Sequence, residues 1–481
     1  MTIFNHQRFD NAVFKLDVER MRRGWYSDKY FENVYQMLTT LAVSGYRYDG
    51  QYPRDVGLDI SGLDVGNMAV EMQIFTRRKG ATLVVGVDKA LTMLRHCAGY
   101  FGTDRDQKPG FSEKTGFRSD DFVETYDQLE VWAVHDGAMV HYPPRGNAGG
   151  GDPRFVQPVM KIRGRYRDFA LLETPILGVL SRASRIATNV YETMVAARGK
   201  PVLFFPARFD AHEVQAADGY AYDVAVQRFN HDYSQHTPSL VSTDAQGDYW
   251  GSRGIGTVPH AVIACFLGDT AAAMVAFAST LPPEVSRIAL VDFNNDNVTD
   301  SLRTLKAMFD RYRELMDAGN EEQARKYVLH GVRLDTSRSV RDVAVPPLGD
   351  PELDLGVNPR LVFIVREALD RAWESWGLSP EWEERAKGYC RDVSIVVSGG
   401  FSPERIRRFE RLGVPADSYG VGSSLMSNDT AVGTNTDFTA DVVRIRVEAP
   451  PRFGGAEVRW VDMAKVGRAP CDNPEMERVV W

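Results

Sequence analysis

The stretch Val393-Ser-Ile-Val-Val-Ser-Gly-Gly-Phe-Ser-Pro-Glu404 contains, in order, an apolar strand, a glycine turn and the start of a helix. A run of β-branched residues is typical of a buried strand, and Pro403 suits the first turn of a helix. The same order, a strand with a polar end and then a helix, recurs from Arg287 and again from Val328. A last short strand surrounds Tyr419. Continuous apolar strands that alternate with helices predict a parallel sheet covered on both faces.

Polar and glycine residues gather where these predicted strands end. They are Asp292, Arg333, Asp335, Thr336, Ser398, Gly399, Gly400, Gly420, Gly422, Ser423 and Ser424. The carboxyl ends of parallel strands meet at one edge, where α/β folds bind their ligands. We therefore predict an irregular TIM-like α/β barrel over residues 166–435, with its site at this rim. Residues 1–165 are predicted to form an N-terminal α+β domain that residues 436–481 complete.

The two glycine-serine strand ends, Ser398-Gly-Gly400 and Gly420-Val-Gly-Ser-Ser424, indicate phosphate binding. Backbone N–H groups that carry no bulky side chain can approach phosphate oxygens closely. Two plain tight turns are the alternative. A Walker loop is excluded because no GxxxxGK[ST] occurs, and Gly254-Ile-Gly256 lacks the third glycine of a dinucleotide fingerprint.

Asp292 and Asp335 are two carboxylates beside this predicted phosphate cradle. Such a pair could bind sugar hydroxyls, or hold Mg²⁺ between the protein and a diphosphate. The alternative is that Arg333 and Asp335 form one structural ion pair among many. Because charged groups at a buried rim are costly unless they are paired or used, we favour a ligand that carries ribose and diphosphate.

The motif Gly256-Thr-Val-Pro-His260-Ala places a histidine between a glycine-bearing turn and an apolar segment. Pro259 fixes its own φ and favours an extended conformation at Val258. His260 is therefore predicted to lie at the first turn of a buried helix, where free N–H groups suit phosphate chemistry. An ordinary histidine beside the core is the alternative.

Composition excludes several classes of protein. The chain has 481 residues, which predicts roughly two to three domains, or one large α/β body with an added domain. Its net charge of −8 argues against a nucleic-acid-binding surface. Four widely spaced cysteines without a CxxC pair argue against a zinc knuckle or a disulfide framework and favour the reducing cytoplasm. The N-terminus lacks the apolar segment of a signal peptide, and the apolar window 258–280 contains His260 and Asp269, which argues against a membrane span.

The N-terminal third contains three further signals. Residues 88–96 predict a helix, and residues 129–142 predict a β-hairpin around Asp136-Gly137, because Asp-Gly suits a type I′ turn. Tyr30 opens another predicted helix, which Asp28 could cap. Its ring either packs within the protein or offers a flat face to a ring-shaped ligand.

An ordered set of motifs in this chain resembles the nicotinate phosphoribosyltransferase family, particularly its shorter archaeal-type members. The motifs are Tyr26-Ser-Asp-Lys-Tyr-Phe31, Leu172-Glu-Thr-Pro-Ile-Leu-Gly178, Phe205-Pro-Ala-Arg208, Gly256-Thr-Val-Pro-His260-Ala, Leu290-Val-Asp292, Gly331-Val-Arg-Leu-Asp-Thr336, Ser398-Gly-Gly400 and Tyr419-Gly-Val-Gly-Ser-Ser424. They occur in the family's order, and the resemblance extends from residue 26 to about residue 445. Each motif alone is weak evidence for this family, whereas the whole set in this order is specific to it.

The resemblance implies a type II phosphoribosyltransferase fold and an enzyme of NAD biosynthesis. Such an enzyme joins the pyridine nitrogen of nicotinate to phosphoribosyl pyrophosphate and releases pyrophosphate. ATP hydrolysis is coupled through a phosphorylated histidine, which His260 matches. The resemblance further implies Mg²⁺, small-molecule substrates, and a cytoplasmic homodimer with shared active sites, without a nucleic-acid or membrane partner.

The resemblance also implies roles for individual residues. Tyr30 matches a tyrosine that reaches across the dimer interface to stack on the pyridine, whose other face Phe205 would cover. Arg208 would pair with the carboxylate or the 5′-phosphate. The catalytic set is His260, Asp292 and Asp335, and the substrate-binding set is Tyr30, Phe205, Arg208, Arg333, Thr336, Ser398, Gly399, Gly400, Gly420, Gly422, Ser423 and Ser424.

Some positions depart from the family pattern. Phe209 stands where a second arginine often follows the first, and residues 292–296 and 241–250 differ from the usual segments. The zinc-binding tail of some archaeal members is absent. A nicotinamide phosphoribosyltransferase and a catalytically silent paralogue that binds a phosphorylated metabolite therefore remain open. Quinolinate phosphoribosyltransferases share the fold but do not need the histidine that His260 matches.

Overall fold

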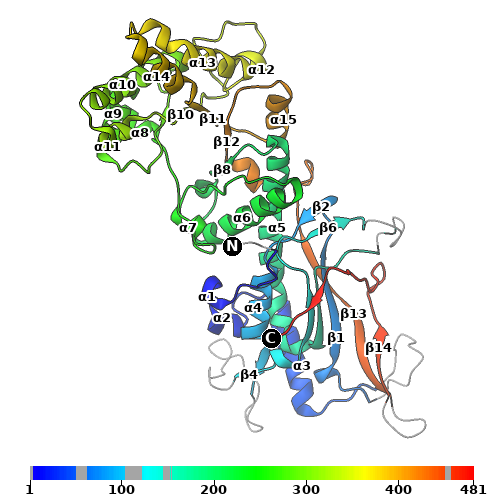
Figure 1. Cartoon of the computed structure of the whole chain (residues 1–481). Helices are drawn as coiled ribbons and strands as arrows, with labels where there is room; N and C mark the ends of the chain where they lie inside the picture. The colour runs from blue at the N-terminus through cyan, green and yellow to red at the C-terminus, as the bar shows by residue number, and fades with distance from the viewer. Residues whose placement is uncertain (1–3, 50–61, 103–121, 145–151, 153, 450–456) are drawn as a thin grey trace. The chain divides into compact units, whose positions relative to one another are not determined.

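The computed structural model describes residues 4–49, 62–102, 122–144, 152, 154–449 and 457–481 (Figure 1). The chain divides into two compact units. Unit 1 combines both ends of the chain, Met1–Thr188 and Asn428–Trp481, and unit 2 is Asn189–Ser427. The boundary falls within one long helix, α5 (Glu173–Ala197).

Unit 1 consists of a large antiparallel sheet, two small two-stranded sheets and several helices. The other helices are α1 (Asn11–Phe14), α2 (Val18–Arg22), α3 (Lys29–Ser44) and α4 (Val87–Cys97). The strands are β1 (Ala69–Thr76), β2 (Gly80–Leu83), β3 (Gly99–Phe101), β4 (Phe122–Glu124), β5 (Glu130–Ala133), β6 (Met139–Tyr142), β7 (Met160–Arg165), β13 (Phe438–Ala449), β14 (Glu457–Asp462) and β15 (Glu477–Arg478).

The large sheet of unit 1 has the strand order β14-β13-β1-β7-β5-β15, so strands from both ends of the chain form one surface (Figure 1). In the middle of it, Met72 of β1 lies opposite Ile162 of β7 and Val442 of β13. Because side chains alternate along a strand, these apolar residues share one face. They form the core of the unit with Leu94 of α4 and Leu180 of α5.

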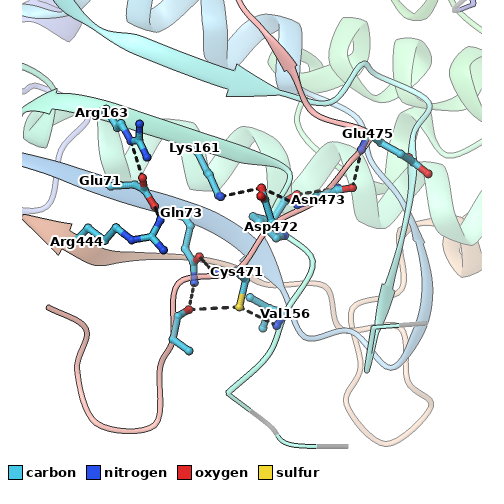
Figure 2. A network of polar contacts seen from close by, with 12 residues as sticks. Glu71, Gln73, Val156, Lys161, Arg163, Arg444, Cys471, Asp472, Asn473 and Glu475 are labelled. Atoms are coloured by element: carbon cyan, nitrogen blue, oxygen red, sulfur yellow. Dashed lines mark hydrogen bonds and ion pairs between the residues drawn. The ribbon is translucent and has the colours of Figure 1, made fainter. Parts of the chain in front are cut away.

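The opposite face of this sheet carries a buried polar network (Figure 2). Glu71 accepts hydrogen bonds from Arg163 (2.6 Å) and Arg444 (2.8 Å) on the two neighbouring strands. Gln73 donates to the carbonyl of Ala469 and accepts from the backbone N–H of Cys471, at 3.0 Å each. Paired charges and amides allow this face to be buried without unsatisfied groups, and they hold the segment before β15 against the sheet.

The predicted hairpin over residues 129–142 is wrong. β5 pairs with β7 and β15, whereas β6 pairs with β2 in another sheet. The Asp-Gly turn is present, and Gly137 has a φ of +93°. However, the buried Asp136 carboxylate accepts hydrogen bonds from the N–H groups of Gly86 and Val87, at 2.8 Å each. The turn is thus tied to the start of α4, and it leads the chain from one sheet to the other.

Unit 2 alternates strands and helices. Its strands are β8 (Val202–Phe204), β9 (Ile288–Leu290), β10 (Gly331–Leu334), β11 (Ser394–Val397) and β12 (Ser418–Val421). Its helices are α6 (Gln215–Tyr233), α7 (Asp244–Gly247), α8 (His260–Cys265), α9 (Thr270–Thr280), α10 (Asn297–Asp317), α11 (Glu321–Ala324), α12 (Pro351–Asp354), α13 (Pro359–Arg371), α14 (Pro380–Arg391) and α15 (Pro403–Arg411).

The five strands of unit 2 form a parallel sheet in the order β8-β12-β11-β10-β9. The predicted parallel sheet is confirmed, and so are the helices that follow β9 and β11. The order is the one that a barrel opened between β8 and β9 would have, and Phe204 adds a single parallel bridge to Val241. Closure of a TIM-like barrel stays a prediction, because β8 and β9 are the two edges of the sheet in the described part of the chain.

The helix that begins at His260 is shorter and more exposed than predicted. α8 spans six residues, of which only Ile263 is buried. The expected buried helix is therefore wrong, because the apolar run breaks at Leu267, whose φ is +56°. Within the described residues, no helix is long and apolar enough to cross a membrane.

Candidate active site

His260 contacts the carboxylate that follows β9. Its Nε2 atom lies 3.0 Å from Oδ1 of Asp292. The His260 side chain is 45% exposed and that of Asp292 only 9%. Burial raises the pKa of Asp292, as does the negative charge of Asp335, whereas His260 opposes that rise. The carboxylate thus fixes one ring nitrogen of an imidazole that stays half exposed to solvent.

A second polar cluster joins the ends of β10 and β11. The Arg333 guanidinium donates to Oγ of Ser398 (3.1 Å), to Oδ2 of Asp335 (3.1 Å) and to Oγ1 of Thr257 (3.4 Å). Ser398 in turn donates to Oδ1 of Asp335 at 2.7 Å. Three strand-end side chains are therefore held rigidly, and Thr257 links them to the loop that carries His260.

Aromatic rings lie against the glycines of β12 and its loop. A Cβ at Gly420 would come within 2.8 Å of the Phe205 ring, and one at Gly422 within 2.6 Å of the Phe209 ring. Both distances are too short for a real side chain. The guanidinium carbon of Arg333 lies 5.7 Å from the centre of the Phe205 ring, within range of a cation–π contact. Phe205 is thereby placed beside the polar cluster.

The Ser398-Gly-Gly400 turn is held by arginines. Gly399 and Gly400 have φ values of +88° and +76°, which favour glycine. Arg405 of α15 donates to the carbonyl of Gly399 at 2.8 Å, and Arg338 donates to that of Gly400. Burial, with the nearby charges of Arg338 and Arg408, lowers the pKa of Arg405 to about 10. Positive charge is therefore concentrated beside the turn.

A cavity of about 460 Å³ adjoins these arginines. Its lining includes Arg338, Arg405 and Arg408 together with Glu352 and Glu404. Arg408 pairs with Glu352 at 2.5 Å. Arginine guanidinium groups match the geometry of phosphate oxygens, but Glu352 and Glu404 in the same lining offset part of their charge.

Several predicted residues have other surroundings. Thr336 is buried, and its hydroxyl accepts a hydrogen bond from Asn297 at 2.8 Å. Ser424 donates to the carbonyl of Phe401 at 2.8 Å and so supports the loop. Ser423 is exposed directly after Gly422. These contacts give Thr336 and Ser424 a supporting position in the site rather than one open to a ligand.

Two predicted residues lie in more open positions. Arg208 is exposed after β8, and its guanidinium carbon lies 5.5 Å from the centre of the Phe209 ring. Tyr30, in the first turn of α3 of unit 1, is 59% exposed. All the predicted site residues except Tyr30 lie in unit 2, and a role for Tyr30 stays a prediction.

Three contact residues were not among those expected from the sequence. Thr257 is part of the His260 motif, Arg338 follows Asp335 by three residues, and Arg405 lies in the first turn of the helix after the glycine turn. For Arg405, the available sequence signal was a basic residue a few positions after a predicted phosphate-binding turn. The direction in which its side chain points could not be predicted, because that depends on how α15 packs against the strand end.

The carboxylates at the strand ends are the residues of this site that could hold a magnesium ion. Asp292 and Asp335 supply oxygen ligands, which Mg²⁺ prefers, and they lie close enough for Asp335 to raise the pKa of Asp292. Both carboxylate oxygens of Asp335 already accept hydrogen bonds, one from Arg333 and one from Ser398. The pair therefore fits an ion brought by a diphosphate better than a fully enclosed protein site.

Comparison with known structures identifies the fold. No protein-family model matches the chain. The structure of nicotinate-nucleotide pyrophosphorylase from Pyrococcus furiosus matches 94% of this chain and 80% of its own, with 23% sequence identity and a TM-score of 0.56. The chain has the fold of that pyrophosphorylase. The fold resemblance expected from the ordered motifs is thereby confirmed.

Two further structures are similar at lower scores. Human nicotinic acid phosphoribosyltransferase matches 80% of this chain and 72% of its own, with 16% identity and a TM-score of 0.49. Nicotinate phosphoribosyltransferase from Porphyromonas gingivalis matches 90% of this chain and 94% of its own, with 16% identity and a TM-score of 0.32. The shared fold therefore rests on the Pyrococcus structure.

Proposed function

We propose that this chain is a nicotinate phosphoribosyltransferase of NAD biosynthesis. It would form nicotinate mononucleotide and pyrophosphate from nicotinate and phosphoribosyl pyrophosphate, with ATP hydrolysis coupled through His260. The observation that carries the proposal is the cluster of Arg333, Asp335 and Ser398 at two adjacent strand ends, next to the His260–Asp292 pair. The fold shared with nicotinate-nucleotide pyrophosphorylase supports it.

In the proposed transfer, the bond between the ribose C1 and the pyrophosphate oxygen breaks, and the pyridine nitrogen bonds to C1. Positive charge develops on the ribose while negative charge grows on the departing pyrophosphate. The anion Asp335 would stabilise the positive charge on the ribose, and the cation Arg333 would stabilise the negative charge on the pyrophosphate. Fixed charges stabilise such a transition state because they need no reorganisation during the reaction. Ser398 would hold both side chains in position.

The donor's 5′-phosphate would bind at the two glycine loops, around Gly399, Gly400, Gly422 and Ser423. Arg338 and Arg405 add positive charge beside the first loop. Mg²⁺ bound to the diphosphate, held by Asp292 and Asp335, would neutralise part of its charge. These placements use residues that follow the carboxyl ends of β9, β10, β11 and β12, together with Arg405 of α15.

Nicotinate would lie against the Phe205 ring, because Gly420 leaves that ring's edge uncrowded. Arg208 is exposed and could pair with the nicotinate carboxylate. In a homodimer, Tyr30 of the second subunit would cover the other face of the pyridine. The exposure of Tyr30 is consistent with such a role.

His260 would accept the γ-phosphoryl group of ATP. The imidazole nitrogen attacks the phosphorus, the bond to the bridging oxygen of ADP breaks, and water later releases phosphate. A histidine whose one nitrogen is fixed by a carboxylate has a defined tautomer, which leaves the other nitrogen nucleophilic. The 3.0 Å contact with Asp292 supplies that partner, and the half-exposed ring leaves access for ATP.

The alternative is a nicotinamide phosphoribosyltransferase on the same scaffold. The observation in its favour is Phe209, which stands beside Arg208 and packs against Gly422. An apolar ring there provides no second cation for an acidic pyridine. A catalytically silent paralogue is less favoured, because Arg333 makes hydrogen bonds to Ser398, Thr257 and Asp335 and so holds a polar cluster at these strand ends.

An acceptor panel tests the proposal. Purified protein is incubated with phosphoribosyl pyrophosphate, Mg²⁺ and ATP, and with nicotinate, nicotinamide or quinolinate in separate reactions. The mononucleotide is quantified by chromatography and mass spectrometry. The proposal expects the nicotinate product to form fastest. A faster reaction with nicotinamide would establish the alternative, and quinolinate as sole acceptor would contradict both.

A further inference from the structure

Two histidines and a glutamate meet in unit 1, and none of them belongs to the candidate active site. Nδ1 of His6 lies 3.6 Å from Oε1 of Glu477, and Nε2 of His135 lies 3.2 Å from Oε2 of the same carboxylate. The two imidazole rings meet edge to face, with centroids 5.2 Å apart. Among the residues that the structure describes, this is the one group of three such side chains whose ligand atoms all lie within 4.8 Å of one another.

Contacts that involve no metal already hold the three segments in place. β15 pairs with β5 through Glu477 and Ala133, so Glu477 lies near His135. Arg8 donates to the carbonyl of Val134 at 3.1 Å and to the carboxylate of Asp88 at 2.9 Å. These bonds anchor the segment that carries His6. The cluster is thus built by the fold, from parts of the chain more than a hundred residues apart.

The spacing of the ligand atoms suits a tetrahedral metal ion. Bonds of about 2.0–2.1 Å from zinc to nitrogen or oxygen place neighbouring ligand atoms roughly 3.3–3.4 Å apart in a tetrahedron. The distances from the two histidines to the nearest Glu477 oxygens are 3.6 Å to Oε1 and 3.2 Å to Oε2, close to that value, and a rotation of the exposed carboxylate would turn one oxygen towards both rings. The third separation, between the two ring nitrogens, is at most 4.8 Å. A small rotation of the exposed His6 ring would close it.

The chemistry of the three groups points to a first-row divalent ion. Imidazole nitrogens favour zinc, copper and nickel, whereas Mg²⁺ and Ca²⁺ prefer oxygen alone. Glu477 adds a carboxylate oxygen, which zinc accepts alongside imidazole nitrogens. Two imidazoles and one carboxylate leave a fourth position that water can occupy.

We propose that His6, His135 and Glu477 form a zinc-binding site that ties the segment before α1, the end of β5 and strand β15 together. The bound ion would stabilise unit 1, because a metal that binds only the folded state shifts the folding equilibrium towards it. The site lies outside the candidate active site, and the proposal does not depend on the proposed enzymatic function.

Zinc titration of the untagged full chain tests this site. After dialysis against EDTA and removal of the chelator, ZnCl₂ binding is measured by isothermal titration calorimetry. We expect one high-affinity Zn²⁺ per chain, and a rise in the thermal unfolding midpoint when it binds. His135→Ala and Glu477→Gln should each weaken this binding by at least about 10-fold and abolish the midpoint rise.

His212→Ala is the matched control. His212 is an exposed histidine whose Nδ1 lies 3.3 Å from the Glu213 carboxylate, and it belongs to no group of three among the described residues. Its loss should leave the stoichiometry and affinity unchanged, and circular dichroism spectra verify that every variant is folded. The proposal is overturned if the wild-type chain binds no zinc tightly, or if folded His135→Ala and Glu477→Gln bind zinc as the wild type does.

Discussion

Nε2 of His260 lies 3.0 Å from Oδ1 of Asp292, and this contact joins the first residue of α8 to the segment that follows β9. The carboxylate is nearly buried, while the imidazole is half exposed. A buried anion that orients an accessible imidazole is the arrangement expected for a histidine that reacts at its free nitrogen. The first prediction tests this relationship.

His260→Ala should abolish the stimulation of mononucleotide formation by ATP and leave a slow ATP-independent transfer. The reason is that phosphoribosyl transfer itself would use Arg333 and Asp335, not the imidazole. The rate is measured with and without ATP under saturating nicotinate. Asp292→Asn is the companion variant, because it keeps the side-chain shape but removes the negative charge beside His260.

Asp292→Asn should retain part of the ATP stimulation, since the histidine remains. Phosphoribosyl pyrophosphate binding, measured by calorimetry, should be nearly unchanged in His260→Ala. Loss of that binding would instead assign His260 a structural role and contradict the phosphoryl-acceptor proposal.

Ser398→Ala should raise the KM for phosphoribosyl pyrophosphate and lower the free energy of unfolding by about 1–3 kcal/mol. The buried hydroxyl accepts from Arg333 and donates to Asp335, so its removal takes one hydrogen bond from each and leaves only the direct Arg333–Asp335 contact between them. Ser394→Ala, at the other end of β11, is the control because its hydroxyl bonds only to the carbonyl of His330. An equal rise in KM for both variants would show that the effect does not come from the Arg333 cluster.

Gly420→Ala should weaken acceptor binding by displacing the Phe205 ring. An added Cβ would approach that ring to within 2.8 Å, so the ring has to move. We expect the KM for the pyridine to rise by about 10-fold, which corresponds to about 1.4 kcal/mol, with a smaller change for the phosphoribosyl donor. Gly388→Ala in α14 is the control, since its Cβ would meet no atom within 4 Å. Unchanged acceptor kinetics in a folded Gly420→Ala protein would count against the placement of the pyridine on Phe205.

The buried carboxyl group of Glu173 should make the free energy of unfolding depend on pH. Burial raises the pKa of this carboxyl from 4.5 to about 7 in the folded protein. Between these values the folded state holds a proton that the unfolded state has lost, so stability falls as the pH rises from 4.5 through 7. One pKa unit corresponds to about 1.4 kcal/mol, so this group lowers the free energy of unfolding by at most about 3.5 kcal/mol. Glu173→Gln should remove this part of the fall, measured by urea unfolding at several pH values, and an identical pH profile would refute it.

The parallel sheet of unit 2 was predictable because its strands carry local signals. Apolar runs end in polar or glycine residues, and Pro359, Pro380 and Pro403 open the helices. The order of these motifs was then enough to predict that Asp292, Arg333 and Ser398 share one edge. Their hydrogen bonds follow from the register that pairs Arg333 with Val396, which places Ser398 two residues beyond that partner.

The errors arose where long-range contacts override local preference. Asp136-Gly137 has the composition of a hairpin turn, yet Asp136 bonds to the start of α4, and its two flanking strands enter different sheets. The apolar run after His260 suggested a buried helix, but α8 ends after six residues with one face uncovered. Neither the cap on α4 nor the packing around α8 leaves a local trace in the sequence.

The most direct test of the proposed function follows the products of one reaction. Wild-type protein and Arg333→Ala are each incubated with nicotinate, phosphoribosyl pyrophosphate, Mg²⁺ and ATP, and nicotinate mononucleotide and pyrophosphate are quantified together. We expect the wild type to form both in equal amounts, and Arg333→Ala to be slower by about 100-fold or more, because a fixed cation for the departing pyrophosphate is lost. Absence of mononucleotide in the wild-type reaction, or equal rates for the two proteins, would contradict the assignment of a phosphoribosyltransferase site to this sheet edge.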